Sequence, residues 1–320
     1  MSMNRRDRDY RGRRFYRFLY NAWWFDFVLF AWRIVRKRLG RFISRGIGLA
    51  YALTHPATVT AIRSNVALLA PERASFRTAC RLLMNQAECF SIYGELAAIQ
   101  PEKVLSLLAK KEGFQFLKQA HDDGKGCLLV TGHLGFFELG GLVMRQMDFP
   151  MTALTQPEPS PGLTQWRTDF RARWGVNTIV VGDDAFSVVE IARTLRNGGF
   201  VAMLADRPYN NSNSIPVECP YGHMLFSGAP VLISLISGCP IIPVGVTTQS
   251  DGKFQITAQP PIYPKWLPEG REQSLAHYTR QIAKSLIPMF MEKPDQWYHF
   301  SSLGCTASSG SSLNPATTIS

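Results

Sequence analysis

The sequence has few cysteines, and none of them belongs to a Cys-x-x-Cys pair. Dispersed cysteines argue against a disulfide framework and against a structural zinc site. They also favour a body that faces a reducing compartment such as the cytosol. The histidines other than His133 show no metal-ligand spacing, so we expect no metal site. The cysteines are Cys80, Cys89, Cys127, Cys219, Cys239 and Cys305.

The sequence also lacks an internal repeat and a Pro/Gly/Ser-rich linker in its middle. With 320 residues, of which 46% are hydrophobic, it is long enough for one large α/β domain. Residues 304–320 are mostly small and polar and can bury little, so we predict a disordered tail there. We therefore expect a basic arm over residues 1–45, a main domain over residues 46–303 and this tail.

Outside the arm, the chain has almost no excess charge of either sign. Residues 1–45 contain 13 of the 35 basic and 3 of the 24 acidic side chains, which gives them a formal charge of +10 and the remainder +1. A local basic arm attracts polyanions, either anionic lipid headgroups or nucleic acid. The near-neutral body and the aromatic content of the arm argue against nucleic acid.

No uninterrupted apolar run in the arm reaches the roughly 20 residues that a spanning helix needs. The segment Phe15–Val35 is rich in Phe, Trp, Tyr and Leu but is interrupted by Arg17, Asp26 and Arg33. Such a composition is typical of the membrane interface. We favour a helix lying in the interface over a single membrane span or a buried core helix. Basic residues follow the segment in place of a small-residue cleavage site, so we do not expect a signal peptide.

The remaining pattern predicts an α/β fold with a mostly parallel central sheet flanked by helices. Residues 40–123 carry apolar residues at helical spacing and predict a helical annex. Short apolar runs then alternate with helical stretches, which is typical of a parallel sheet. The predicted strands are Cys127–Val130, Met151–Leu154, Thr178–Val181, Phe200–Leu204, Ile241–Val246 and Phe254–Ala258. The predicted helices are Phe137–Arg145, Gly162–Trp174, Ala185–Asn197, Ala229–Ser237 and Ser274–Glu292.

The segment most indicative of chemistry, TGHLGFFELGG over residues 131–141, directly follows the first of these strands. In open α/β sheets, sites form beyond the carboxyl ends of the strands. His133 and Glu138 are five residues apart, which on one regular helix would place their side chains about 140° from each other. If they interact, His133 must lie in the loop and Glu138 in the first helical turn.

Such a pair is suited to activating a hydroxyl group. His133 can accept the proton of a hydroxyl as it attacks a thioester carbonyl. Glu138 would then accept a hydrogen bond from the other imidazole nitrogen, fix the tautomer and stabilise the imidazolium. Because the substrate supplies the hydroxyl, no covalent acyl-enzyme is needed.

Four blocks of the sequence together resemble the lysophospholipid acyltransferase superfamily, in its branch of bacterial lipid A late (lauroyl/myristoyl) acyltransferases. The resemblance covers about residues 40–303, and the order and spacing of the blocks make it specific. The blocks are the HX4E motif His133–Glu138, then FVAMLADRPY at 200–209, then FSGAP to GCPIIPV at 226–244, and PDQWY at 294–298.

The resemblance implies an acyltransferase domain over residues 46–303, with His133 as catalytic base and Glu138 as its partner. It implies a thioester of acyl carrier protein or coenzyme A as donor, a membrane lipid acceptor and no other cofactor. An enzyme of this kind is expected at the cytosolic face of the inner membrane. Asp206 resembles the second-site acid of the family.

Four residues are candidates for substrate binding: Asp206, Arg207, Ser227 and Gly228. Arg207 could hold a phosphate or another anionic group, although with Asp206 it could instead form a structural salt bridge. Ser227 and Gly228 precede a predicted helix whose free N–H groups could bind an anion, and a plain helix cap fits them equally well.

Two departures from the family pattern concern the acceptor. His299, Phe300, Ser301 and Ser302 stand where lipid A enzymes typically carry a basic run, and Gln156 stands where they often have an arginine. Another glycolipid, an aminolipid or a polyene lipid therefore stays open as acceptor. A thioester hydrolase and a non-catalytic membrane adaptor are the alternative functions.

Overall fold

The computed structural model describes the chain except for residues 1–25, 27–29, 31–36, 183–184, 209–213 and 304–320. The predicted interfacial segment Phe15–Val35 lies almost wholly outside the described residues, as does the predicted tail. Among the residues that are described, no helix is both long and apolar enough to cross a bilayer.

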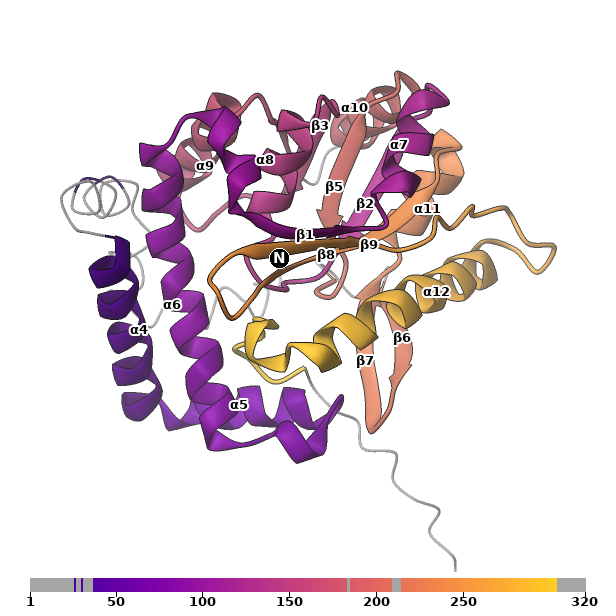
Figure 1. The fold of residues 1–320 in the computed structure, drawn as a ribbon. Coiled ribbons are helices and arrows are strands. Elements are labelled where there is room, and N and C mark those ends of the chain that lie inside the picture. The colour runs from indigo at the N-terminus through magenta and orange to yellow at the C-terminus, as the bar shows by residue number, and fades with distance from the viewer. Residues whose placement is uncertain (1–25, 27–29, 31–36, 183–184, 209–213, 304–320) are drawn as a thin grey trace, which may run out of the picture.

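A seven-stranded sheet forms the centre of the molecule, in the order β1-β9-β8-β2-β5-β3-β4 (Figure 1). Every neighbouring pair is parallel except β8 and β9, so the predicted mostly parallel sheet is confirmed. The strands are β1 (Leu108–Glu112), β2 (Cys127–Thr131), β3 (Met151–Thr155), β4 (Asn177–Val180), β5 (Phe200–Leu204), β8 (Ile241–Thr248) and β9 (Phe254–Ala258).

Helices cover both faces of this sheet, because successive residues of the buried strands point to opposite sides. Cys127 and Leu129 of β2 join one hydrophobic cluster, and Leu128 and Val130 join the other. The first cluster packs under α5 (Pro56–Ala67), α6 (Phe76–Ala98), α7 (Phe114–Asp122), α8 (Glu138–Gln146) and α9 (Pro161–Arg173). The second packs under α10 (Ala185–Arg196), α11 (Ala229–Ser237), α12 (Arg271–Glu292) and the hairpin β6 (Ser214–Cys219) with β7 (Gly222–Ser227).

The predicted helical annex is confirmed over most of its length. Helix α4 (Lys37–Thr54) packs along α6 at one side of the molecule (Figure 1). The prediction is wrong at Leu108–Glu112, which forms strand β1 at the edge of the sheet, paired with β9. The sequence LAKKE favours a helix locally, and the pairing with β9 overrides that preference.

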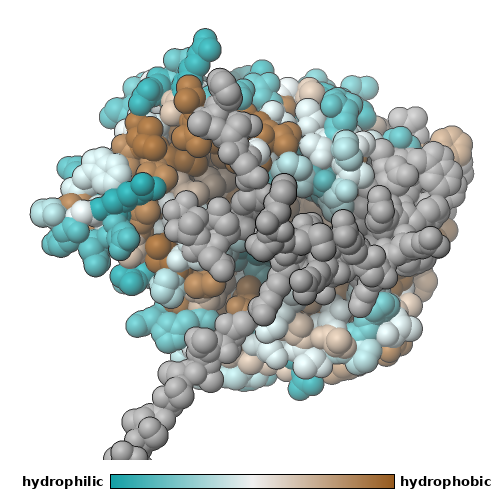
Figure 2. Space-filling view, turned by 180° about the vertical axis from the view of Figure 1, so that it is seen from behind, coloured by the Kyte–Doolittle hydropathy of each residue, from teal (hydrophilic) through white to brown (hydrophobic). Residues whose placement is uncertain are grey.

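Exposed apolar side chains occur on α10 and on α4. Val188 and Val189 of α10 are exposed, and hydrophobic residues gather at the upper left when the molecule is seen from behind, on the side where α10 lies (Figure 2). On α4 the exposed apolar residues follow one another at helical spacing: Leu39, Phe42, Ile43, Ile47, Leu49 and Leu53.

Candidate active site

His133 lies in a tight loop between β2 and α8, as the spacing argument required. Two glycines allow this loop to pack closely. A Cβ at Gly132 would come within 2.5 Å of the Phe290 ring, and one at Gly135 within 2.1 Å of the Val246 carbonyl oxygen. Gly135 also has a positive φ of 55°, which other residues rarely adopt. The loop therefore presents His133 at the carboxyl end of the sheet.

The carboxylate that meets His133 is Asp206, just beyond strand β5. His133 Nδ1 is 2.8 Å from Asp206 Oδ1, and the His133 backbone N–H donates to Asp206 Oδ2 at 2.8 Å. Asp206 Oδ2 also accepts from Trp297 Nε1 at 3.0 Å and lies 2.9 Å from His299 Nε2. Asp206 has no exposed surface, so these four contacts take the place of its water shell.

The charge of this cluster follows from its burial. Burial alone would raise the pKa of Asp206, but the attraction of His133 and His299 and their hydrogen bonds hold it well below its ordinary value. Burial lowers the pKa of His299, which favours the neutral imidazole. Because a carboxylate only accepts, His133 must donate from Nδ1 and His299 from Nε2. In the neutral ring of His133 the lone pair is therefore on Nε2, on a side chain that is 24% exposed.

The chain segment after α12 holds the other side of this loop. The Gly135 backbone N–H donates to the Gln296 carbonyl at 2.8 Å, and the Tyr298 N–H donates to the His133 carbonyl at 2.7 Å. Trp297 is buried, and its ring stacks on the Phe290 ring of α12. Its backbone forms an isolated antiparallel β-bridge with Leu134. Trp297 and Tyr298 pack against the body, and Trp297 in addition donates a hydrogen bond to Asp206.

Glu138 begins helix α8, but its partner is Arg171 of α9. Arg171 donates from Nε to Glu138 Oε2 at 3.0 Å and from Nη2 to Oε1. The predicted hydrogen bond between Glu138 and His133 is therefore wrong, because the other carboxylate, Asp206, occupies His133 Nδ1. Burial would raise the pKa of Glu138, and the Arg171 guanidinium lowers it overall. Glu138 is thus an ionised, buried carboxylate in an ion pair.

The other predicted site residues lie around Asp206. Arg207 donates from Nη2 to the Tyr298 carbonyl, which ties the end of β5 to the segment after α12. Gly228 is the N-cap residue of α11, and Ser227 Oγ accepts from the Ala229 N–H at 3.2 Å, a local turn contact just before the helix. The Ser227 N–H bonds the carbonyl of the residue before Asp206.

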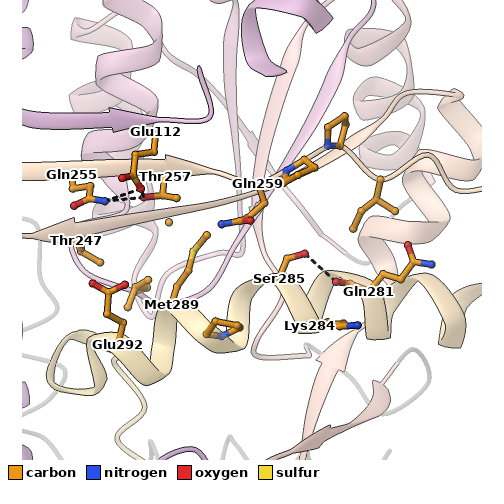
Figure 3. A pocket seen from close by; sticks show the side chains of 16 residues that line it. Glu112, Thr247, Gln255, Thr257, Gln259, Gln281, Lys284, Ser285, Met289 and Glu292 are labelled. Carbon is orange, nitrogen blue, oxygen red and sulfur yellow. Dashed lines mark hydrogen bonds between the residues drawn. The ribbon is translucent and has the colours of Figure 1, made fainter. Parts of the chain in front are cut away.

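Two cavities lie among the described residues. One of about 60 Å³ lies between α8 and the ends of β2, β3 and β5, where Phe137, Arg171 and mostly apolar side chains line it. The larger, of about 610 Å³, lies between α12 and the polar face of β8 and β9, and Figure 3 shows Gln255, Thr257 and Glu112 joined there. His133 lines neither cavity. The smaller cavity is lined by Thr131, just before the His133 loop, and by Phe137, at the end of that loop.

Three potential metal ligands lie together in the part of the chain that the structure describes: His133, Asp206 and His299, with ligand atoms within 4.8 Å of one another. Two ligands about 2.1 Å from one tetrahedral metal would be about 3.4 Å apart. The 2.8 and 2.9 Å separations are those of hydrogen bonds. The donor set, which includes an indole N–H, fits a proton relay better than a metal site.

Sequence reasoning missed two of the residues in this region. His299 was assigned no role because it has no ligand-like spacing, yet it is almost fully buried against Asp206. Arg171 carried no signal at all. The one available signal was the position of His299, which directly follows the family block PDQWY at 294–298.

Comparison with known proteins gives one clear result. The family model described as bacterial lipid A biosynthesis acyltransferase matches residues 11–303. No curated protein matches the chain. The matched range includes both the His133 loop and the segment after α12 that binds it.

Proposed function

This chain belongs to the family of bacterial lipid A biosynthesis acyltransferases, and from that premise we propose that it transfers a fatty acyl group from an acyl thioester to a hydroxyl of a lipid acceptor. The donor is a thioester of acyl carrier protein or coenzyme A. The acceptor is a glycolipid of the lipid A type or a related membrane lipid. No cofactor other than the thioester takes part.

The proposal is carried by one observation, the hydrogen bond between His133 Nδ1 and Asp206 Oδ1. It leaves Nε2 as the basic nitrogen of a partly exposed imidazole. Nε2 takes the proton of the acceptor hydroxyl while the oxygen bonds to the thioester carbonyl carbon. Asp206 stabilises the imidazolium that forms. As the C–S bond breaks, the proton passes from Nε2 to the sulfur, which leaves as a thiol.

Glu138 supports the same site from a different position. As the first residue of α8, it fixes the end of the His133 loop, and its pairing with Arg171 joins α8 to α9. We assign it the role of a positioning residue. Arg207, Ser227 and Gly228 lie at the edge of the Asp206 cluster, where an anionic group of donor or acceptor could bind.

The test compares wild type with His133→Ala, using an acyl thioester and a lipid extract as acceptor. Loss of a general base lowers the rate about 10²- to 10⁴-fold. Equal acyl transfer by both proteins would contradict the proposal. Fast thioester turnover without any acceptor, again dependent on His133, would favour the alternative, a hydrolase. If deletion of residues 1–45 removed all function and His133→Ala changed nothing, the chain would be a non-catalytic adaptor.

We also place the enzyme at the cytosolic face of the inner membrane, bound to the bilayer surface. Helix α4 supports this, because its outward face is apolar: Phe42 is 75% and Leu53 64% exposed. The inward face is clamped to α6, where a Cβ at Gly48 would come within 2.5 Å of a backbone oxygen. Arg41 binds Glu95 from the flank. The apolar face of α4 would lie in the membrane interface beside the basic arm.

Flotation with vesicles tests this placement. Phe42→Ser and Leu53→Ser together should weaken binding to vesicles containing anionic lipid. The same two substitutions should leave acyl transfer to a detergent-dispersed acceptor intact. Unchanged flotation of the double variant would contradict a role for α4 in membrane binding.

A further inference from the structure

Asp206 Oδ2 accepts three hydrogen bonds, and two of the donors, Trp297 and His299, have no assigned role in the reaction. The three come from the His133 backbone N–H, from Trp297 Nε1 and from His299 Nε2. We propose that His299 is a positioning residue of acyl transfer, which holds the Asp206 carboxylate so that Oδ1 remains directed at His133 Nδ1. This inference rests on the proposed function of His133 as the base.

The first argument is geometric. A carboxylate turns readily about the bond to its Cβ, because that torsion has a broad, roughly two-fold profile. The loop N–H and the indole bind Oδ2, and His299 adds a third donor from the segment after α12, at 2.9 Å. With Oδ2 fully occupied, only Oδ1 is left for the imidazole of His133. The carboxylate plane is therefore fixed before any substrate binds.

The second argument concerns charge. The titratable and charged groups that act on His299 are Asp206, Arg207 and His133. Burial lowers the pKa of His299, so it donates its hydrogen bond as a neutral ring. A lysine or arginine at this position would add a positive charge next to the imidazole of His133, 5.7 Å away, and would oppose formation of its imidazolium. A neutral imidazole satisfies the carboxylate oxygen without that cost.

The third argument is that His299 is itself held in place. It is 2% exposed, and its ring lies 4.6 Å from that of Trp297. Its backbone carbonyl accepts from Asn65 Nδ2 at 3.2 Å, and the same amide group binds Ser301 and Leu303. Asn65 of α5 thus fixes the segment that carries His299, so the donor cannot move away from Asp206.

The experiment measures kcat, KM and the pH profile of kcat/KM for His299→Phe and His299→Gln. Phe keeps a ring but removes the donor, whereas the Gln amide nitrogen can replace Nε2. For His299→Phe we expect kcat to fall about tenfold, well short of the roughly 10²–10⁴-fold that a general base supplies, with KM unchanged. The acid limb of the kcat/KM profile should move to higher pH in this variant. With one hydrogen-bond donor fewer, the Asp206 carboxylate attracts a proton to the imidazole of His133 more strongly. His299→Gln should recover most of kcat.

Controls separate this inference from the proposed function. His277→Phe, an exposed change on α12, should match wild type in every measurement. An active wild type and an inactive His133→Ala, together with unchanged kcat and acid limb in His299→Phe, would overturn the inference alone. Equal losses in the Phe and Gln variants would also overturn it. If His299→Phe does not fold, His299→Asn, whose amide is too short to reach Asp206 from the same backbone, takes its place.

Discussion

Asp206 and Glu138 are two buried carboxylates near the same end of the sheet, and they differ in the groups that bind them. Asp206 is bound by two imidazoles, an indole and a backbone N–H. Glu138 is bound by the guanidinium of Arg171. An imidazole gains and loses a proton near neutral pH, whereas a guanidinium does not. The first carboxylate can therefore assist proton transfer, and the second can only hold structure.

The largest effect should come from Asp206→Asn. The amide nitrogen of Asn would face His133 Nδ1 and impose the opposite tautomer, with the proton on Nε2. An equivalent change in a serine-protease triad lowers kcat about 10⁴-fold, and we expect a fall of about 10³- to 10⁴-fold here. Steady-state kinetics of a folded variant check this. Activity close to that of wild type would show that Asp206 does not assist proton transfer by His133.

A smaller effect, on stability rather than on chemistry, should follow from breaking the Glu138 pair. Glu138→Leu leaves the buried Arg171 guanidinium without its carboxylate and should cost about 3–5 kcal/mol of unfolding free energy. Arg171→Leu should cost less, because Arg167 Nη1 still lies 3.8 Å from Glu138 Oε1. The double variant should recover most of that loss, because neither charge remains. Denaturant unfolding of wild type and the three variants gives the four free energies of this double-mutant cycle.

The same double variant tests the comparison directly. If Glu138 only positions the His133 loop, the folded double variant should keep its activity within about tenfold of wild type. A loss as large as that of Asp206→Asn, in a protein of normal stability, would instead make Glu138 a catalytic partner of His133.

The smallest effect concerns stability at acid pH. The pKa of His299 is lowered in the folded state from an ordinary value of 6.5, chiefly by burial. A group with a depressed pKa contributes stability that is present above its unfolded value and is lost as the pH falls through its folded value. The melting temperature of wild type should therefore drop between pH 7 and 5, and that of His299→Gln should drop by a few degrees less. Parallel curves would contradict a buried, titrating His299.

Much of the sheet could be predicted because its strands are short apolar runs bounded by turn residues. The predicted bounds of Phe200–Leu204 and Phe254–Ala258 agree with the structure. Strand β1 was missed because its polar sequence becomes a strand only through pairing with β9 at the edge of the sheet. The hairpin β6–β7 was also missed, and its two strands pair with each other outside the main sheet. Such pairing is a tertiary effect that local patterns do not carry.

The contacts of the candidate site were predicted only in part, for a related reason. The motif identified His133 and placed it correctly in the loop after β2. Its partner was sought nearby in the sequence, at Glu138, whereas the hydrogen bond reaches Asp206, 73 residues further along the chain. His299 lies 93 residues beyond Asp206. These contacts depend on strand order and on the return of the segment after α12, which spacing alone does not give.

The most direct test of the central claim, that Asp206 orients His133 as the base, is the tautomer of His133. A long-range ¹H–¹⁵N correlation spectrum of histidine-labelled protein above neutral pH reports which ring nitrogen carries the proton, with His133→Ala for assignment. We predict the proton on Nδ1 in wild type and in the double variant of Glu138 and Arg171. A proton on Nε2 in wild type would contradict the account.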